Sequence, residues 1–129
     1  EISACLVGSE MCIRDRYWHD PADRDAIAAE LDTLGGIEVT RSYAMNIEVM
    51  GEGATKGTAL TWLCEHLGER LADAWAFGDN INDIPMLQAA GHGMAMINAE
   101  PEDREAADAR HEYDNDHDGV ARTIMDALA

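Results

Sequence analysis

Residues 75–87 read WAFGDNINDIPML, a short apolar run followed at once by a polar turn. The run from Ala74 to Phe77 lacks the apolar–polar alternation of a half-solvated strand, so it predicts a buried strand of a parallel sheet. Pro85 then predicts the start of a helix, because its missing N–H costs nothing in a first turn. Between the strand and the helix the turn carries Asp79, Asn82 and Asp83.

This polar turn lies where open α/β sheets bind ligands, beyond the carboxyl end of a strand. A helix N-terminus beside it favours anions such as phosphate. Two carboxylates close together repel unless a cation lies between them, and hard oxygen ligands suit Mg²⁺. The turn therefore predicts a metal or phosphate site. The spacing alone leaves open a simple acidic loop in a very acidic protein.

The length and charge of the chain exclude several classes of function. Its 129 residues can bury one core, and its formal charge of −17 disfavours binding to nucleic acids or to anionic membranes. The sequence has neither an apolar stretch near the length of a membrane span nor a signal peptide. Three cysteines without a CxxC pair indicate a reducing, cytoplasmic setting.

Lys56 is the only lysine, because the other eight basic residues are arginine. A compact ammonium differs chemically from a guanidinium fork, so a single retained lysine is a candidate functional residue. Chance in a lysine-poor chain is the competing explanation.

The order of predicted elements indicates a small α+β unit followed by part of an α/β unit. Residues 1–18 are irregular after a candidate strand at 2–7, and 8–17 resemble a translated adapter sequence. Residues 19–52 predict a helix that begins near Pro21 and ends at Gly35, and then two strands, at 37–41 and 44–50. The glycine-rich break at 51–55 is the best boundary in the chain.

From residue 54 onward helices and strands alternate, which favours a parallel sheet with crossover helices. The predicted helices cover 56–67, 85–90, 102–109 and 120–128, and the strands 74–77, 93–97 and 110–113. In the first of these helices Leu60, Leu63, Cys64 and Leu67 share one face and predict a buried stripe.

Four blocks of sequence resemble, in order, those of haloacid dehalogenase-like phosphatases of the capped, Cof-type group. They are TKGTAL at 55–60, FGDNINDIPML at 77–87, GMAMINA at 93–99 and DGVA at 118–121. The resemblance implies the C-terminal half of a Rossmann-like core at 53–129. It also implies that residues 19–52 are the remnant of an α+β cap domain.

The resemblance further implies Mg²⁺-dependent hydrolysis of small phosphorylated metabolites, sugar phosphates among them, through an aspartyl-phosphate. It assigns catalytic roles to Lys56, Asp79 and Asp83. Lys56 and Asn82 would bind the phosphate, Asp79 would ligate the metal directly and Asp83 would support the metal from outside its coordination shell. These roles agree with the need to neutralise an anion in an acidic protein.

The sequence departs from the family at the nucleophile, because no DxDGT-type motif follows a buried strand. We therefore expect this chain alone to be inactive, and an absent set of strands to leave a sheet uncovered and open to self-association. Residues 116–120 spell DxDGV, but no apolar strand precedes them, which disfavours a catalytic role.

A non-enzymatic acidic domain that binds Mg²⁺ or Ca²⁺, through Asp79 and Asp83 or through the acidic loop at 114–118, is the alternative. Asp114, Asp116 and Asp118 match the opening of an EF-hand loop, although its twelfth position is Met125 rather than glutamate.

Overall fold

The computed structural model describes residues 14–110 and 112–129 in two compact units, which divide between Thr55 and Lys56. Each unit contains its own three-stranded sheet. The strand expected at residues 2–7 and most of the segment predicted to be irregular lie outside the described residues, but residues 14–17 of that segment form a strand, so the prediction is wrong there.

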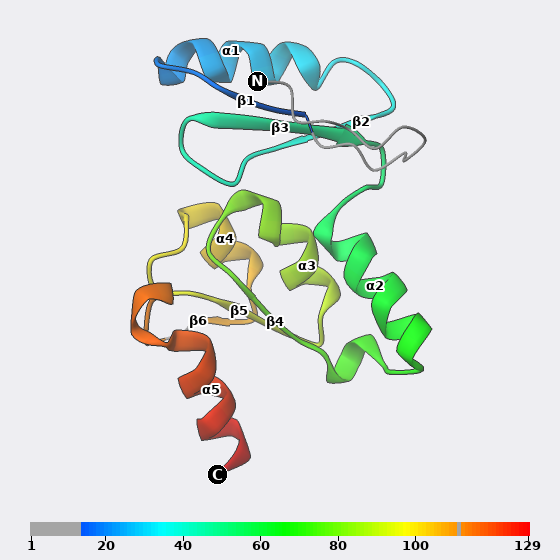
Figure 1. Cartoon of the computed structure of the whole chain (residues 1–129), viewed down its shortest axis with the longest axis vertical. Helices are drawn as coiled ribbons and strands as arrows, with labels where there is room; N and C mark the ends of the chain where they lie inside the picture. The colour runs from blue at the N-terminus through cyan, green and yellow to red at the C-terminus, as the bar shows by residue number, and fades with distance from the viewer. Residues whose placement is uncertain (1–13, 111) are drawn as a thin grey trace. The chain divides into compact units, whose positions relative to one another are not determined.

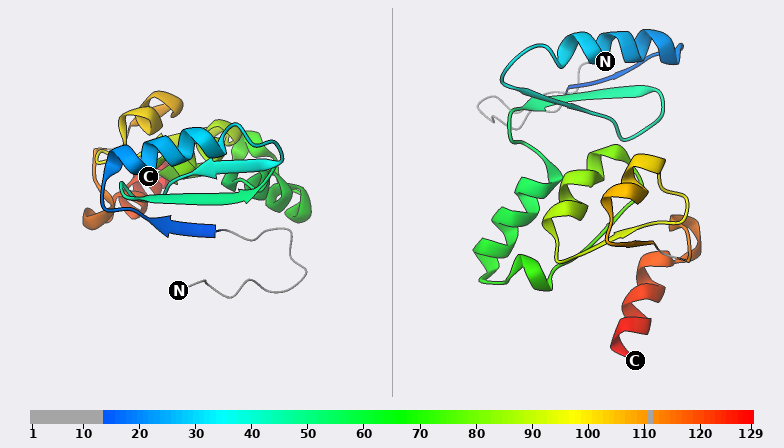
Figure 2. Two further views of the ribbon diagram at one scale, coloured as in Figure 1. Left: turned by 90° about the horizontal axis from the view of Figure 1, so that it is seen from above. Right: turned by 180° about the vertical axis from the view of Figure 1, so that it is seen from behind.

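The first unit is an antiparallel sheet with one helix along it (Figures 1 and 2). Its strands are β1 (Arg14–Tyr17), β2 (Ile37–Thr40) and β3 (Asn46–Gly51), in the order β1-β3-β2, and its helix is α1 (Pro21–Leu31). Asp20 caps α1 by accepting a hydrogen bond from the Ala22 N–H at 2.9 Å. The predicted helix followed by two strands is thus present.

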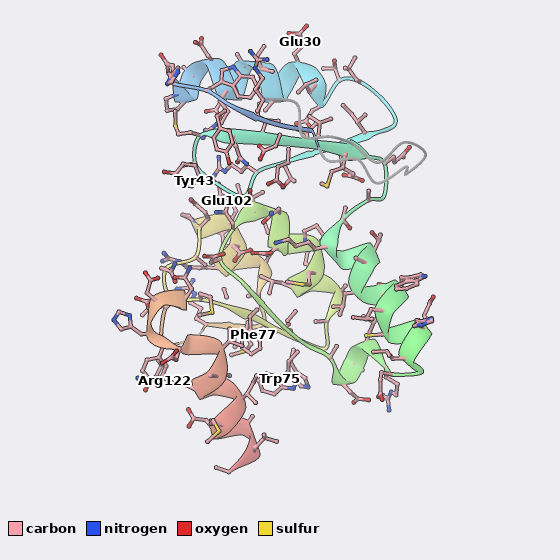
Figure 3. All side chains as sticks on the ribbon, in the orientation of Figure 1. Glu30, Tyr43, Trp75, Phe77, Glu102 and Arg122 are labelled. Carbon is pink, nitrogen blue, oxygen red and sulfur yellow. The ribbon has the colours of Figure 1, made fainter. Side chains whose placement is uncertain are left out.

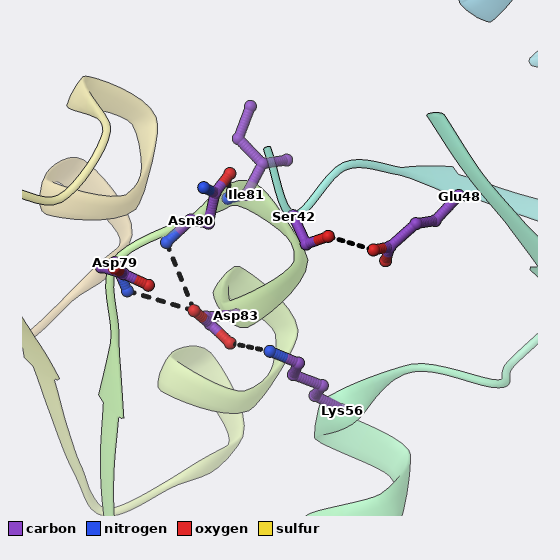
Figure 4. A network of polar contacts seen from close by, with 7 residues as sticks. All are labelled: Ser42, Glu48, Lys56, Asp79, Asn80, Ile81 and Asp83. Atoms are coloured by element: carbon purple, nitrogen blue, oxygen red, sulfur yellow. Dashed lines mark hydrogen bonds and ion pairs between the residues drawn. The ribbon is translucent and has the colours of Figure 1, made fainter. Parts of the chain in front are cut away.

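A buried amide shapes the turn between β2 and β3. Asn46 is fully buried, and its Oδ1 accepts hydrogen bonds from the backbone N–H groups of Ser42 and Tyr43 at 3.2 and 3.0 Å. The Ser42 hydroxyl donates to the largely buried Glu48 carboxylate (Figure 4). Side-chain bonds of this kind replace the backbone ladder where the chain reverses.

The second unit contains a parallel sheet, which confirms the predicted α/β class. Its strands run in the order β4 (Trp75–Gly78), β5 (His92–Ala95) and β6 (Ala109–Arg110). The helices are α2 (Lys56–Leu67), α3 (Ile84–Ala89), α4 (Pro101–Ala106) and α5 (Gly119–Leu128). Short 3₁₀ turns occur at η1 (Leu71–Asp73), η2 (Ile81–Asp83) and η3 (Asn115–His117). Among the described residues no helix combines the length and the apolar character needed to cross a bilayer.

The two faces of the parallel sheet differ. Helices α3 and α4 cover one face, where Ala76, Leu87 and Ala90 form the core, and α5 lies on the other side (Figures 1 and 2). Trp75 and Phe77 extend from β4 toward the side of α5 (Figure 3). Trp75 is 44% exposed, so the prediction of a fully buried strand is wrong at this residue. Trp75 lies on the side of β4 away from the core of Ala76, Leu87 and Ala90, and β4 is an edge strand of the described sheet.

Helix α2 has the predicted bounds but a different buried face. Cys64 is buried, whereas Leu63 and Leu67 are 45% and 63% exposed, so the predicted buried stripe is wrong for both leucines. The packed face is centred on Gly57 and Cys64, the two buried residues of the helix. A Cβ added at Gly57 would lie 2.3 Å from the carbonyl oxygen of Pro85, at the start of α3.

This close approach predicts that Gly57→Ala lowers the free energy of unfolding by about 1–2 kcal/mol, because the added methyl overpacks the α2–α3 contact. Helix propensity alone predicts the opposite sign, a gain of about 1 kcal/mol. Ala59→Gly, at an exposed position of the same helix, is the matched control and should cost about 1 kcal/mol. Urea unfolding of the three proteins measures both effects. A Gly57→Ala protein more stable than the parent would contradict the packing.

Candidate active site

The carboxylate of Asp83 organises the turn after β4 (Figure 4). Asp83 is 5% exposed, and its Oδ2 accepts hydrogen bonds from the backbone N–H groups of Asp79 and Asn80 at 3.1 and 3.3 Å. Asn80 completes a capping box with Asp83 across η2. A Cβ on Gly78 would lie 2.5 Å from the Cβ of Asp83, so only glycine fits at the end of the strand.

Lys56, the first residue of α2, contacts the Asp83 carboxylate. Its Nζ donates to Asp83 Oδ1 in an ion pair. The Lys56 side chain is 48% exposed and that of Asp83 is 7% exposed, so the lysine reaches a buried carboxylate from a partly exposed position. One helix and one strand therefore return the chain to the same place, and the structure brings Lys56 and Asp83 together.

Asp79 is held by a neighbour that the sequence did not suggest. Its Oδ2 accepts a hydrogen bond from Asn115 Nδ2 at 3.1 Å, and Asn115 Oδ1 accepts one from Asn98 Nδ2 at 3.1 Å. Asn115 comes from η3 and Asn98 follows β5. Both residues lie in or beside the sequence blocks quoted above, but no spacing rule pairs amides so far apart along the chain.

Two further polar residues, Asn82 and Asp103, belong to the elements around the Asp79–Asp83 turn. Asn82 is half-buried within η2, beside Asp83. Asp103, in the first turn of α4, is fully buried, and neither of its carboxylate oxygens has a hydrogen-bond partner among the residues that the structure describes. Burial, and then the negative charges of Asp83 and Asp79, raise the pKa of Asp103 to about 6. Sequence reasoning missed this residue, because an aspartate in an acidic first helical turn is ordinarily exposed.

The donor atoms of this cluster suit a hard cation. Asp83 uses both oxygens to hold Lys56 and the turn, which fits a supporting role, while Asp79 is the candidate direct ligand. Among residues 14–110 and 112–129, no three histidine, cysteine, aspartate or glutamate side chains gather closely enough to hold a metal by themselves. The buried oxygens of Asp103 have no hydrogen-bond partner among the described residues.

The acidic loop at 114–118 is organised by bonds within itself. Asp114 Oδ1 accepts from the Asp116 N–H at 3.1 Å, and its contact with His117 lowers the pKa of the carboxyl. The DxDGV letters thus fall on η3 and the start of α5 rather than after a strand. This placement agrees with the expectation that they do not mark a nucleophile.

The sequence and the fold of the chain match those of a known family. The family model of the haloacid dehalogenase-like hydrolases matches residues 11–124. The chain belongs to this family. It is 40% identical over 119 residues to the 5-amino-6-(5-phospho-D-ribitylamino)uracil phosphatase of Bacillus subtilis. The aligned region covers 87% of this chain and 47% of that relative.

Solved structures of haloacid dehalogenase-like proteins show the same architecture. A hydrolase of the family from B. subtilis superposes with a TM-score of 0.83 at 31% identity, over 88% of this chain and 39% of that protein. A sugar phosphatase of subclass IIB gives a TM-score of 0.73 at 28% identity, over 81% and 40% of the two chains. The chain thus spans less than half the length of each of these relatives.

Proposed function

We propose that this chain carries part of the active site of a Mg²⁺-dependent phosphatase that hydrolyses small phosphorylated metabolites, sugar phosphates among them. The observation that carries the proposal is the joining of Lys56 to the Asp79–Asp83 turn through the buried Asp83 carboxylate. The relatives named as phosphatases, one of a ribityl phosphate and one of sugars, support the substrate class.

In this proposal each residue acts on charge or position. Lys56 presents its ammonium to the phosphoryl oxygens, and Asp83 fixes the direction of that ammonium. Asn82 would donate an amide N–H to the phosphate, and Asp79, whose carboxylate accepts a hydrogen bond from Asn115, would hold the metal. When bound, Mg²⁺ supplies Lewis-acid neutralisation of the phosphoryl charge.

The nucleophile of the proposed reaction is an aspartate that these 129 residues do not offer in the required context. Its carboxylate would form the aspartyl-phosphate that water then hydrolyses. We therefore propose that the chain alone turns over no phosphomonoester. The assignment of residues 19–52 to a cap remnant and of 53–129 to the core remains part of the same proposal.

The source DNA upstream of Tyr17 tests this function. Its in-frame translation should contain an apolar strand that ends in DxDGT, and the extended protein should release phosphate from sugar phosphates when Mg²⁺ is present. Lys56→Ala and Asp79→Ala should each abolish that release. An extended protein that folds and binds Mg²⁺ but releases no phosphate would refute the proposed activity.

The hydrogen bond from Asn115 predicts a graded effect on metal binding. Asn115→Ala should weaken Mg²⁺ binding about 10-fold, because outer-shell partners orient metal-ligating carboxylates. Asn98→Ala, which removes only the partner of Asn115, should cost less. Titration calorimetry measures both changes. An unchanged affinity in Asn115→Ala would show that Asp79 needs no such support.

The alternative, a non-enzymatic metal-binding domain, makes a different prediction in the same calorimeter. Tight Ca²⁺ binding that is lost in Asp116→Ala and retained in Asp79→Ala would favour the acidic loop over the phosphatase site.

Self-association through the less covered face of the parallel sheet also remains a proposal. Trp75 and the apolar α5 residues Val120, Ile124 and Leu128 are 40% to 81% exposed, which supports it. Light scattering over a range of concentrations should show dimers or larger species. A sharp monomer signal at high concentration would contradict it.

A further inference from the structure

Asp103 is a buried carboxyl group whose surroundings do not satisfy it. The residue is 0% exposed, and neither Oδ1 nor Oδ2 has a hydrogen-bond partner among the described residues. Burying a carboxyl group without such bonds is costly, and buried polar groups in native proteins are nearly always paired. This position therefore has an unmet demand for a donor or a cation.

The backbone ties Asp103 to the candidate site. Glu100, immediately before α4, donates its N–H to the carbonyl oxygen of Asp79 at 3.1 Å, which fixes the start of the helix against the turn after β4. Helix α4 also contacts η2 and α3. Asp103 is close enough to Asp83, Asp79 and Lys56 for the charges of all three to act on its carboxyl group.

The carboxylates of buried Asp83 and Asp103 and of half-buried Asp79 repel one another, and the ammonium of Lys56 is already paired with Asp83. A bound dication would offset this repulsion. Because no three such side chains are close enough to ligate a metal directly within the described ranges, Asp103 would reach the ion through water. Mg²⁺ suits this arrangement, since it keeps several of its waters when it binds to a protein.

We propose that Asp103 is a further residue of the metal site, whose carboxylate accepts a hydrogen bond from a water molecule on the Mg²⁺ that Asp79 ligates. The inference rests on the proposed function. It adds to Lys56, Asp79, Asn82 and Asp83 a residue from a separate helix, 20 positions beyond Asp83 in the sequence.

Calorimetric titration of the 129-residue chain with Mg²⁺ alone tests the inference. Asp103→Asn should raise the Mg²⁺ dissociation constant about 10-fold, and Asp103→Val, which has no polar atom, at least as much. Glu102→Gln is the matched control, because it removes a neighbouring but exposed carboxylate of the same helix, and should change the constant less than about 2-fold. Thermal melts without metal verify that each variant is folded.

The outcomes separate the inference from the proposed function. Binding that is abolished in Asp79→Asn but unchanged in both Asp103 variants would overturn the inference and leave the metal site standing. Parent protein that shows no Mg²⁺ binding at millimolar concentrations would overturn the role of Asp103 together with that of Asp79. If Glu102→Gln weakened Mg²⁺ binding as much as the Asp103 variants do, the loss would come from the general negative charge of the surface. That result would also overturn the inference.

Discussion

Asp83→Ala should lower the free energy of unfolding by about 2–4 kcal/mol, because it removes the acceptor of two backbone N–H groups and the partner of an ammonium. The Asp79 and Asn80 N–H groups lie in a partly buried turn, and both bond to Asp83 Oδ2. Alanine leaves these donors and Lys56 without that carboxylate. It also opens the space beside Gly78 that the Asp83 side chain fills.

Urea unfolding at neutral pH without metal measures this loss, and Asp79→Ala is the control. Asp79 is half-buried and accepts one side-chain bond, from Asn115, so its replacement should cost less than about 1 kcal/mol. If both variants lost equal stability, Asp83 would not be the residue that holds the turn.

The sequence predicted those helices and strands whose ends are marked by nearby residues, such as a proline, a glycine or a capping aspartate. Helix α2 has its predicted bounds, Lys56–Leu67, and α1 begins at the predicted proline after its aspartate cap. The β4–turn–α3 order followed from an apolar run, a glycine and a proline, each of which acts over a few residues. The pairing of Lys56 with Asp83 is compatible with the predicted order, because a helix and a strand return the chain to one end of the sheet.

Features that depend on packing were not predictable in the same way. Leu63 and Leu67 fit an apolar stripe by spacing, but Gly57 lets α3 approach a different face of α2. The bond from Asn115 to Asp79 joins residues 36 positions apart, and no local pattern encodes it. Asp103 reads as an exposed helix-start acid, and only the tertiary position of α4 shows that it is buried.

We expect Asp103 to contribute to the pH dependence of the chain's stability, and Asp103→Asn to remove that contribution. Its pKa rises from an ordinary value of 3.8 to about 6, through burial first, then Asp83 and Asp79, with Glu100 adding to the rise and Lys56 opposing it. The folded protein therefore holds this proton to a higher pH than the unfolded chain does. The resulting stabilisation is complete below about pH 4 and is lost as the pH rises through about 6.

Relative to the parent, Asp103→Asn should gain about 1–3 kcal/mol of unfolding free energy between pH 4 and pH 8, because the amide never ionises. Denaturant unfolding of both proteins across this range without divalent metal measures the change, with Glu102→Gln as the exposed control. If the difference in unfolding free energy between Asp103→Asn and the parent stayed constant from pH 4 to pH 8, Asp103 would ionise as readily in the folded protein as in the unfolded chain. If the difference does rise, millimolar Mg²⁺ should reduce it, because a dication near Asp103 stabilises the ionised carboxylate that burial disfavours.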